Sequence, residues 1–152
     1  MRTPIADAQR LEHARYHPSP DLEQYVEHFW AVRWDLHGLP PHRAEALPHP
    51  SVHLVFERWV GGRIMGVARG KFSTMLEGSG GVFAAKFTPG GFYPFVRTPI
   101  VTFTNSRASL SSIWGPAGEG LEQAVLGESE DASRIAIVEE FLRRQGPGPD
   151  ET

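Results

Sequence analysis

Two segments decide the predicted fold, residues 47–57, LPHPSVHLVFE, and residues 82–95, VFAAKFTPGGFYPF. Each contains a short run in which apolar and other residues alternate, next to proline or glycine. Alternation with a period of two is typical of a strand that buries one face. In the first segment Leu54 and Phe56 would share one strand face, and His53 would lie on the other. The pattern predicts strands of one sheet or barrel, with any readable function close to them.

The composition is that of one globular domain. The 152 residues are 40% hydrophobic and 22% charged, which suffices for a sizeable core. The absence of cysteine excludes disulfides and thiolate metal sites and fits a reducing compartment, so we expect a cytoplasmic protein. No apolar run approaches the roughly 18 residues of a membrane span. The net charge of −3 does not favour direct contact with a nucleic-acid backbone.

The N-terminal part is expected to change from helix to strand. Residues 1–18 are polar and without a steady period, and are predicted to form an arm. Ser19-Pro20-Asp21 is typical of a helix start, and an apolar stripe with helical spacing follows it. The stripe consists of Leu22, Tyr25, Val26 and Phe29. From Trp30 the period becomes two, which predicts a strand over 30–36 with Trp30 and Trp34 on one face.

The middle of the chain is predicted to be a meander of short strands. Residues 38–48 hold three prolines and a glycine and are expected to form an irregular connection. Strands are expected over 51–57, 64–67, 71–76, 82–87 and 100–104. Gly61-Gly62 and the glycine-rich stretch 78–81 are predicted to be turns between them.

The C-terminal part is predicted to be helical. Short helices are expected around Leu110–Trp114 and Leu121–Leu126, followed by a longer one that Ser129 caps and Gly146-Pro147 ends. The apolar stripe of this last helix should bury against the domain or against a second subunit, and it makes up our predicted dimer interface: Ile135, Val138, Phe141 and Leu142. Strands followed by helices give an α+β fold class.

Five blocks, in this order, carry a resemblance to a known family: SPDLEQYVEHFWAVRW, LPHPSVHLVFE, GKFSTMLEGSGGVFAAKFTPGGFYPF, TNSRASLSSIWG and VEEFLRRQGPGPD. Together they resemble the N-terminal domain of a branch of AraC-type bacterial transcription regulators. The resemblance implies an effector-sensing and dimer-forming domain, with DNA bound only through a C-terminal helix-turn-helix half that this chain lacks. It also implies a cupin-like, jelly-roll-like barrel before C-terminal helices, and a curved antiparallel sheet packed by those helices is the alternative. The expected layout is an arm at 1–18, a sensor domain at 19–145 (β-rich over 30–104, helical over 107–145) and the start of a linker at 146–152.

The aromatic residues of the strands are the candidate effector pocket. Ring-bearing side chains with a few polar anchors are typical of small-molecule sites, whereas a plain hydrophobic core is the simpler interpretation of any single one. The predicted ligand-binding set is Trp30, Arg33, Trp34, His53, Phe56, Phe83, Lys86, Phe87, Phe92 and Phe95, with Tyr93 as a further aromatic of the group.

A metal-dependent enzyme is a second hypothesis, and a plain interaction module is a third. His49, His53 and Glu57 form H-x3-H-x3-E, which could suggest a cupin-type metal set. Such a set also needs a histidine from a later strand, and all seven histidines lie between His13 and His53. The sequence has no G-x-S-x-G elbow and no phosphate-loop lysine after 78–81. We therefore expect no metal, no cofactor and no catalytic activity, and the expected partners are an unknown effector and a second copy of the chain.

Overall fold

The fold is an open antiparallel sheet packed on one side by helices. The computed structural model describes residues 11–40, 42–46, 51–57, 61–65, 72–76, 78–96 and 107–146. In this part of the chain a six-stranded sheet has the order β1-β2-β7-β4-β5-β8, and β3 pairs with β6 in a separate two-stranded sheet. The α+β class, with C-terminal helices after the strands, is confirmed. Of the two predicted architectures the curved sheet is the observed one, because the sheet does not close into a barrel.

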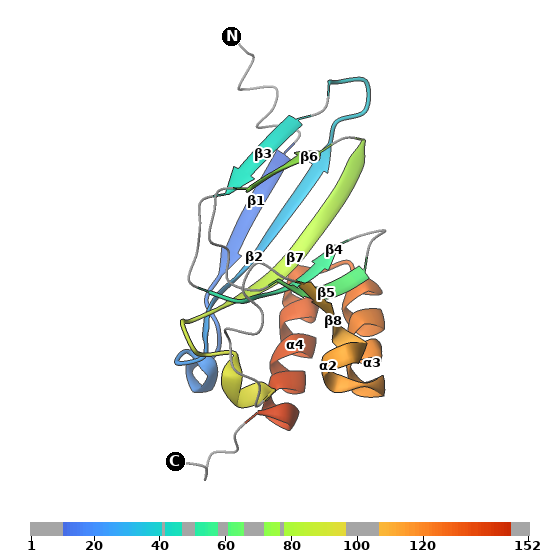
Figure 1. Ribbon diagram of the computed structural model, residues 1–152. Helices are drawn as coiled ribbons and strands as arrows, with labels where there is room; N and C mark the ends of the chain where they lie inside the picture. The colour runs from blue at the N-terminus through green and yellow to red at the C-terminus, as the bar shows by residue number, and fades with distance from the viewer. Residues whose placement is uncertain are drawn as a thin grey trace.

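The strands are short apart from β2 and β7, which have ten and nine residues. Their bounds are β1 Leu11–Tyr16, β2 Val26–Asp35, β3 His42–Ala46, β4 His53–Glu57, β5 Gly61–Met65, β6 Phe72–Leu76, β7 Ser79–Phe87 and β8 Arg107–Ser109. The predicted strands at 51–57, 71–76 and 82–87 are found, each with a shifted boundary. The predicted strand at 100–104 lies outside the described residues. In Figure 1, β3 and β6 cross in front of the upper part of β1, β2 and β7, on the side away from α4.

The helix predicted after Ser19 is wrong beyond its first turn. Only a 3-10 helix, η1 (Pro20–Leu22), forms, and β2 begins at Val26. The strand has a register shift between Val26 and His28, so Val26 and Phe29 are both buried although three residues apart. A bulge of this kind adds one residue to the period of two. It therefore imitates the i, i+3 spacing that predicted a helix.

Three further segments are strands that the sequence analysis did not predict. Residues 11–16, placed in the arm, form the edge strand β1, which pairs with β2 from Leu11↔Trp34 to Tyr16↔Phe29. Residues 42–46 belong to the stretch predicted to be irregular and form β3. The third is β8, which pairs with β5. Pairing with a distant strand supplies the hydrogen bonds that local sequence preference does not encode.

Two glycine pairs predicted to be turns lie inside strands. Gly61 and Gly62 open β5, and β7 begins at Ser79, so only Gly78, with φ 63°, keeps a turn conformation in the stretch 78–81. At Gly80 a β-carbon would come within 2.4 Å of the Trp34 ring. The glycine is therefore required because an aromatic ring from the neighbouring strand lies over its backbone.

The helices follow the prediction closely. Their bounds are α2 Leu110–Trp114, α3 Pro116–Leu126 and α4 Asp131–Gln145. Ser109 caps α2 by accepting a hydrogen bond from Ser112 N, whereas the N-cap of α4 is Glu130 and not the predicted Ser129. Gly146 ends α4 as predicted. No helix in the described ranges is both long and apolar enough to cross a membrane.

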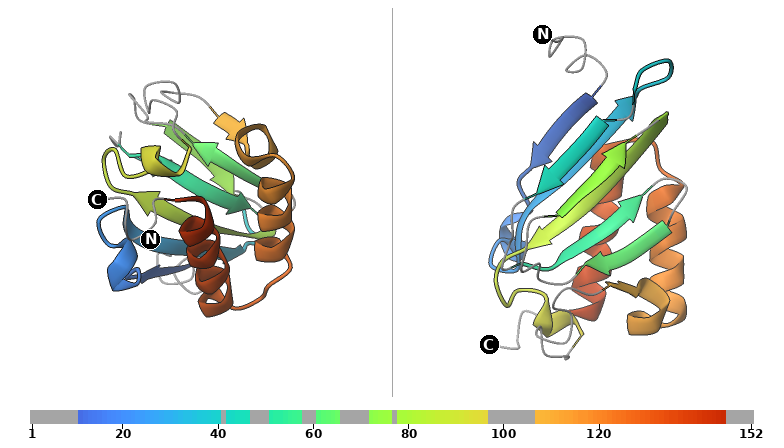
Figure 2. Two further views of the ribbon diagram at one scale, coloured as in Figure 1. Left: turned by 90° about the horizontal axis from the view of Figure 1, so that it is seen from below. Right: turned by 45° about the horizontal axis from the view of Figure 1, so that its top comes forward.

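The core lies between the helices and one face of the six-stranded sheet, which we call the helix-side face (Figure 2). Strand residues on this face alternate with residues of the opposite face. Five phenylalanines are the largest fully buried side chains: Phe29, Phe56, Phe83, Phe87 and Phe92. The helices add Leu110, Leu121, Val125, Val138 and Leu142.

Candidate functional site

A cleft of about 890 Å³ lies where the end of the sheet meets the connection between α3 and α4. The sheet contributes Glu12 of β1, residues 33–35 of β2 and residues 79–83 of β7, and the helices contribute residues 125–129 and Arg134. Its lining mixes charged side chains with the buried rings of Phe56 and Phe83. A concave site of this size with a few polar groups is typical of small-molecule binding.

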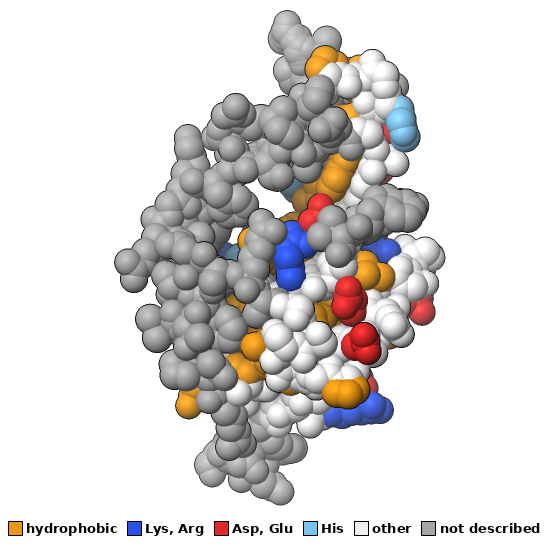
Figure 3. All heavy atoms as spheres, turned by 45° about the vertical axis from the view of Figure 1, so that its right-hand side comes forward, with side chains coloured by type: hydrophobic (Ala, Val, Ile, Leu, Met, Phe, Trp, Pro, Cys, Tyr) orange, Lys and Arg blue, Asp and Glu red, His pale blue; other side chains and the backbone are white. Residues whose placement is uncertain are grey.

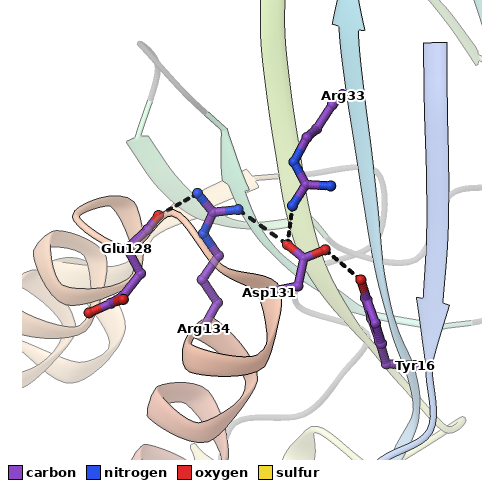
Figure 4. A network of polar contacts seen from close by, with 5 residues as sticks. All are labelled: Tyr16, Arg33, Glu128, Asp131 and Arg134. Atoms are coloured by element: carbon purple, nitrogen blue, oxygen red, sulfur yellow. Dashed lines mark hydrogen bonds and ion pairs between the residues drawn. The ribbon is translucent and has the colours of Figure 1, made fainter. Parts of the chain in front are cut away.

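A cluster of polar side chains at this cleft joins the sheet to α4 (Figure 4). Asp131, only 8% exposed, accepts a hydrogen bond of 2.6 Å from the Tyr16 hydroxyl and one of 2.5 Å from Arg33 Nη2. Arg134 Nη1 lies 3.3 Å from the same carboxylate, and its Nη2 donates to the carbonyl oxygen of Glu128. We call Tyr16, Arg33, Asp131 and Arg134 the Asp131 cluster. It connects β1, β2, the α3–α4 connection and the first turn of α4.

The cluster fixes the protonation of its members. Burial by itself raises the pKa of Asp131, but the hydrogen bonds from Arg33 and Tyr16 and the charges of Arg33 and Arg134 outweigh burial and lower it. The hydrogen bond to Asp131, together with burial, raises the pKa of Tyr16. The hydrogen bond to Asp131 also raises the pKa of Arg33. A carboxylate at the first position of a helix is further favoured by the helix dipole. The cluster is therefore an ionised carboxylate held by two guanidinium groups and a neutral phenol.

A second polar contact fixes the other end of α4. Glu139, 6% exposed, accepts hydrogen bonds from the backbone N–H and the hydroxyl of Ser19, at 2.8 and 2.7 Å. Arg143 binds Asp21 through two hydrogen bonds of 2.9 and 3.0 Å. The Ser-Pro-Asp segment therefore docks α4 onto the chain just before β2.

The structure separates the predicted ligand-binding residues into three places. Four of them line the cleft: Arg33, Trp34, Phe56 and Phe83. Strand alternation and register place Trp30, His53 and Lys86 on the face of the sheet away from the helices, and Trp34 shares this face at the strand end that borders the cleft. The predicted residues therefore do not form a single pocket. Successive residues of a strand point to opposite faces of the sheet, and the predicted set contained residues of both faces.

The remaining three predicted ligand-binding residues belong to the core. Phe87 packs edge-on to Phe92, with ring centroids 5.0 Å apart, and also contacts Phe95. All three are at most 4% exposed. They fill space between the sheet and the helices and do not line the cleft. Tyr93, by contrast, is 45% exposed.

The residues of the predicted dimer interface pack in part within their own chain. Val138 and Leu142 are fully buried in the core of their own chain, and Ile135 and Phe141 are half-buried against it. Trp114 packs edge-on to Phe141, with ring centroids 4.9 Å apart. The stripe packs against its own domain, which is one of the two alternatives that the sequence left open, the other being a second subunit.

The candidate metal ligands are only partly placed. His49 lies outside the described residues, while His53 and Glu57 share one face of β4. Within the described part of the chain, no three His, Asp or Glu side chains come close enough to hold a metal ion.

Three members of the Asp131 cluster were not singled out from the sequence as site residues. Asp131 lies at the start of the last helix, where an acid complements the helix dipole, and Tyr16 falls within the predicted arm. Tyr16 and Asp131 are 115 residues apart in the chain. No local pattern links them, and a buried carboxylate between two arginines becomes visible only when the sheet and α4 are packed.

The comparisons with known proteins give a family and no named relative. The comparison with curated proteins finds no match. The comparison with solved structures finds none either. Residues 14–109, which include the second half of β1 and end with β8 just before α2, match the family described as "Domain of unknown function (DUF6597)". This match covers more than half of the chain, and the protein therefore belongs to the DUF6597 family.

Proposed function

We propose that this chain is the effector-binding and dimerisation domain of a cytoplasmic bacterial transcription regulator of the AraC type, and not an enzyme. In this proposal a DNA-binding half follows residue 152, as the resemblance of the sequence implies. The observation that supports it most is the cleft, because its lining is shared between the sheet and the α3–α4 connection. A ligand in that position contacts both parts of the domain at once.

The Asp131 cluster supplies a route from the cleft to α4. Arg33 and Arg134 line the cleft and also bind Asp131. An effector that engages either guanidinium competes with Asp131 for its hydrogen bonds. An effector can shift an equilibrium between two arrangements only by its difference in affinity for them. The cluster gives it that difference, because one arrangement keeps the arginines on Asp131 and the other releases them.

Position 81 offers a direct test of effector binding. Gly81 pairs with Arg33 across the strands, and a β-carbon there would meet only Val32 O at 3.6 Å and Arg33 Cγ at 3.8 Å. Gly81→Leu should therefore place a side chain into the cleft without a clash. Ala124→Leu on α3 is the matched control, because Ala124 is exposed and does not line the cleft.

The experiment is native mass spectrometry of the purified protein, followed by a thermal-shift screen of small metabolites. We expect a bound or stabilising molecule with the wild type and with Ala124→Leu, and its loss with Gly81→Leu. A ligand that binds Gly81→Leu as tightly as the wild type would place the effector elsewhere. If no metabolite binds any of the three proteins, the sensing proposal fails and an interaction module is favoured.

Dimerisation is assigned to the outer surface of α3 and α4. A shallow groove of about 520 Å³ lies between these helices, lined by Ala117, Gly120, Leu121, Ala136, Ile137 and Phe141 together with Glu140, Arg144 and Gln145. Small residues let a second helix approach closely, and the half-exposed Ile137 gives it an apolar contact. On the face shown in Figure 3, the hydrophobic side chains of the described residues form separate areas among polar and charged atoms. Light scattering of Ile137→Glu should show a monomer if the groove holds a second copy. Ala124→Glu is the control, because Ala124 is exposed on α3 and does not line the groove.

A further inference from the structure

The face of the sheet opposite the helices carries a row of basic side chains that the cleft does not use. His28 of β2 lies beside Lys86 of β7, and Lys86 lies beside His53 of β4, in directly paired positions. Side chains in such positions on one face are about 5 Å apart at their β-carbons. Arg63 of β5 is paired with Val55 of β4. Val55 lies two residues after His53, so Arg63 is on the same face as the row. We call His28, His53, Arg63 and Lys86 the basic row.

The basic row is largely withdrawn from solvent. The side chains of His28, Lys86 and Arg63 are 13, 15 and 18% exposed. The whole chain has 15 basic and 18 acidic residues. An overall excess of basic residues therefore does not explain why basic side chains gather on this face. Burial of cationic groups is costly unless hydrogen-bonded anions accompany them. The row therefore needs hydrogen-bonded anions beside it.

The carboxylates of the described residues satisfy the basic row only in part. A carboxylate oxygen of Glu27 lies 3.3 Å from Lys86 Nζ and 3.7 Å from His28 Nδ1, and the side chain of Glu27 is 45% exposed. Glu57 binds Nη2 of Arg63 at 2.9 Å. The other terminal nitrogen of Arg63, Nη1, is buried and finds no hydrogen-bond partner among the residues that the structure describes. A guanidinium has five N–H donors and no acceptor, so this nitrogen requires an acceptor.

An aromatic ring completes the surroundings of the row. The half-buried Trp30 lies edge-on to His53, with ring centroids 6.0 Å apart and an angle of 71°. Its ring is on the same face, next to the row on β2. A site for an organic anion needs two elements, hydrogen-bond donors that favour a negative charge and a flat apolar surface beside them.

We propose that the basic row is a binding site for a small organic anion, a carboxylate or phosphate whose charged group contacts Lys86, His53 and Arg63 and whose apolar part lies against Trp30. The site is separate from the cleft, because neither Trp30 nor any residue of the basic row lines the cleft. Its occupant supplies the acceptor that Arg63 Nη1 lacks.

The test uses sodium benzoate and inorganic phosphate as probes, with benzamide as the uncharged analogue of benzoate. A titration of the ¹⁵N-labelled wild type is followed by NMR. Benzoate should shift the amide signals of His53, Lys86 and Trp30, with a dissociation constant on the order of 1 mM. The signals of Arg33 and Gly81 in the cleft should stay in place, and benzamide should have no comparable effect. Phosphate should shift the same signals if the charge alone suffices.

Lys86→Met and Arg63→Gln should each weaken benzoate binding about tenfold, since each removes a charge-assisted hydrogen bond. Arg144→Gln on the far helix is the control for a general loss of positive charge. Three results would overturn the inference: no shift by benzoate or phosphate at about 20 mM, equal affinity in Lys86→Met and the wild type, or shifts confined to the cleft. The wild-type titration decides the matter even if a variant does not fold. Its outcome is independent of the effector screen, because the two sites have different reporter signals.

Discussion

The most informative perturbation of this fold is Asp131→Asn. The change keeps the size of the side chain and removes its charge. Asparagine has one carbonyl oxygen, so it can accept from Tyr16 or from Arg33, and its amide group then faces a donor. A hydrogen bond to a charged group contributes about 1.5–3 kcal/mol. Because Arg33 is 40% exposed and its interaction is screened by solvent, we expect a loss of about 2 kcal/mol in the free energy of unfolding at pH 7.

The pH dependence gives this prediction its sign. The pKa of Asp131 is lower in the folded protein than the value near 3.9 of an unfolded chain. The carboxylate therefore stabilises the fold fully above about pH 4, and this contribution disappears as the pH falls through the folded pKa. The difference in the free energy of unfolding between the wild type and Asp131→Asn should therefore become smaller as the pH falls.

The assay is urea unfolding followed by circular dichroism at a series of pH values from about 7 to 3. Glu130→Gln is the matched control, because Glu130 is the neighbouring acid and caps α4 without a side-chain hydrogen bond. It should cost less than about 0.5 kcal/mol. A cost of Asp131→Asn no larger than that of Glu130→Gln, or a cost that does not change with pH, would show that the cluster does not hold α4 to the sheet.

Four further predictions concern other contacts. Tyr16→Phe should cost about 1 kcal/mol at neutral pH, and the difference from the wild type should vanish as the pH rises through the raised pKa of Tyr16, as alkaline urea unfolding would show. Gly80→Ala should destabilise by about 1–3 kcal/mol and change tryptophan emission, because a β-carbon would displace the Trp34 ring; unchanged emission would contradict this. Leu142→Ala should cost about 3 kcal/mol in thermal or urea unfolding, against less than about 1 for Leu126→Ala, which is 37% exposed. Asp21→Asn should cost only about 0.5 kcal/mol and lose this effect in high salt, since both partners of that ion pair are largely exposed.

The sequence alone identified the elements whose pattern is local. Capping residues, a 3.6-residue apolar period and terminating glycines specify helices within a few turns, so α2, α3 and α4 lie close to where they were expected. Strict alternation did the same for β4 and the second half of β7. Where the period was disturbed, as by the bulge between Val26 and His28, the same reasoning predicted the wrong element.

The tertiary structure decided everything that depends on which face is covered and on which strands are neighbours. Alternation shows that Trp30 and Phe83 belong to strands, but not that one lies opposite the helices and the other beneath them. The register across β2, β7 and β4 aligns His28, Lys86 and His53. The docking of α4 brings Asp131 to Tyr16 and Arg33. Such contacts join residues that are far apart in the chain, and their energy comes from packing and mutual desolvation, which no local stretch of sequence contains.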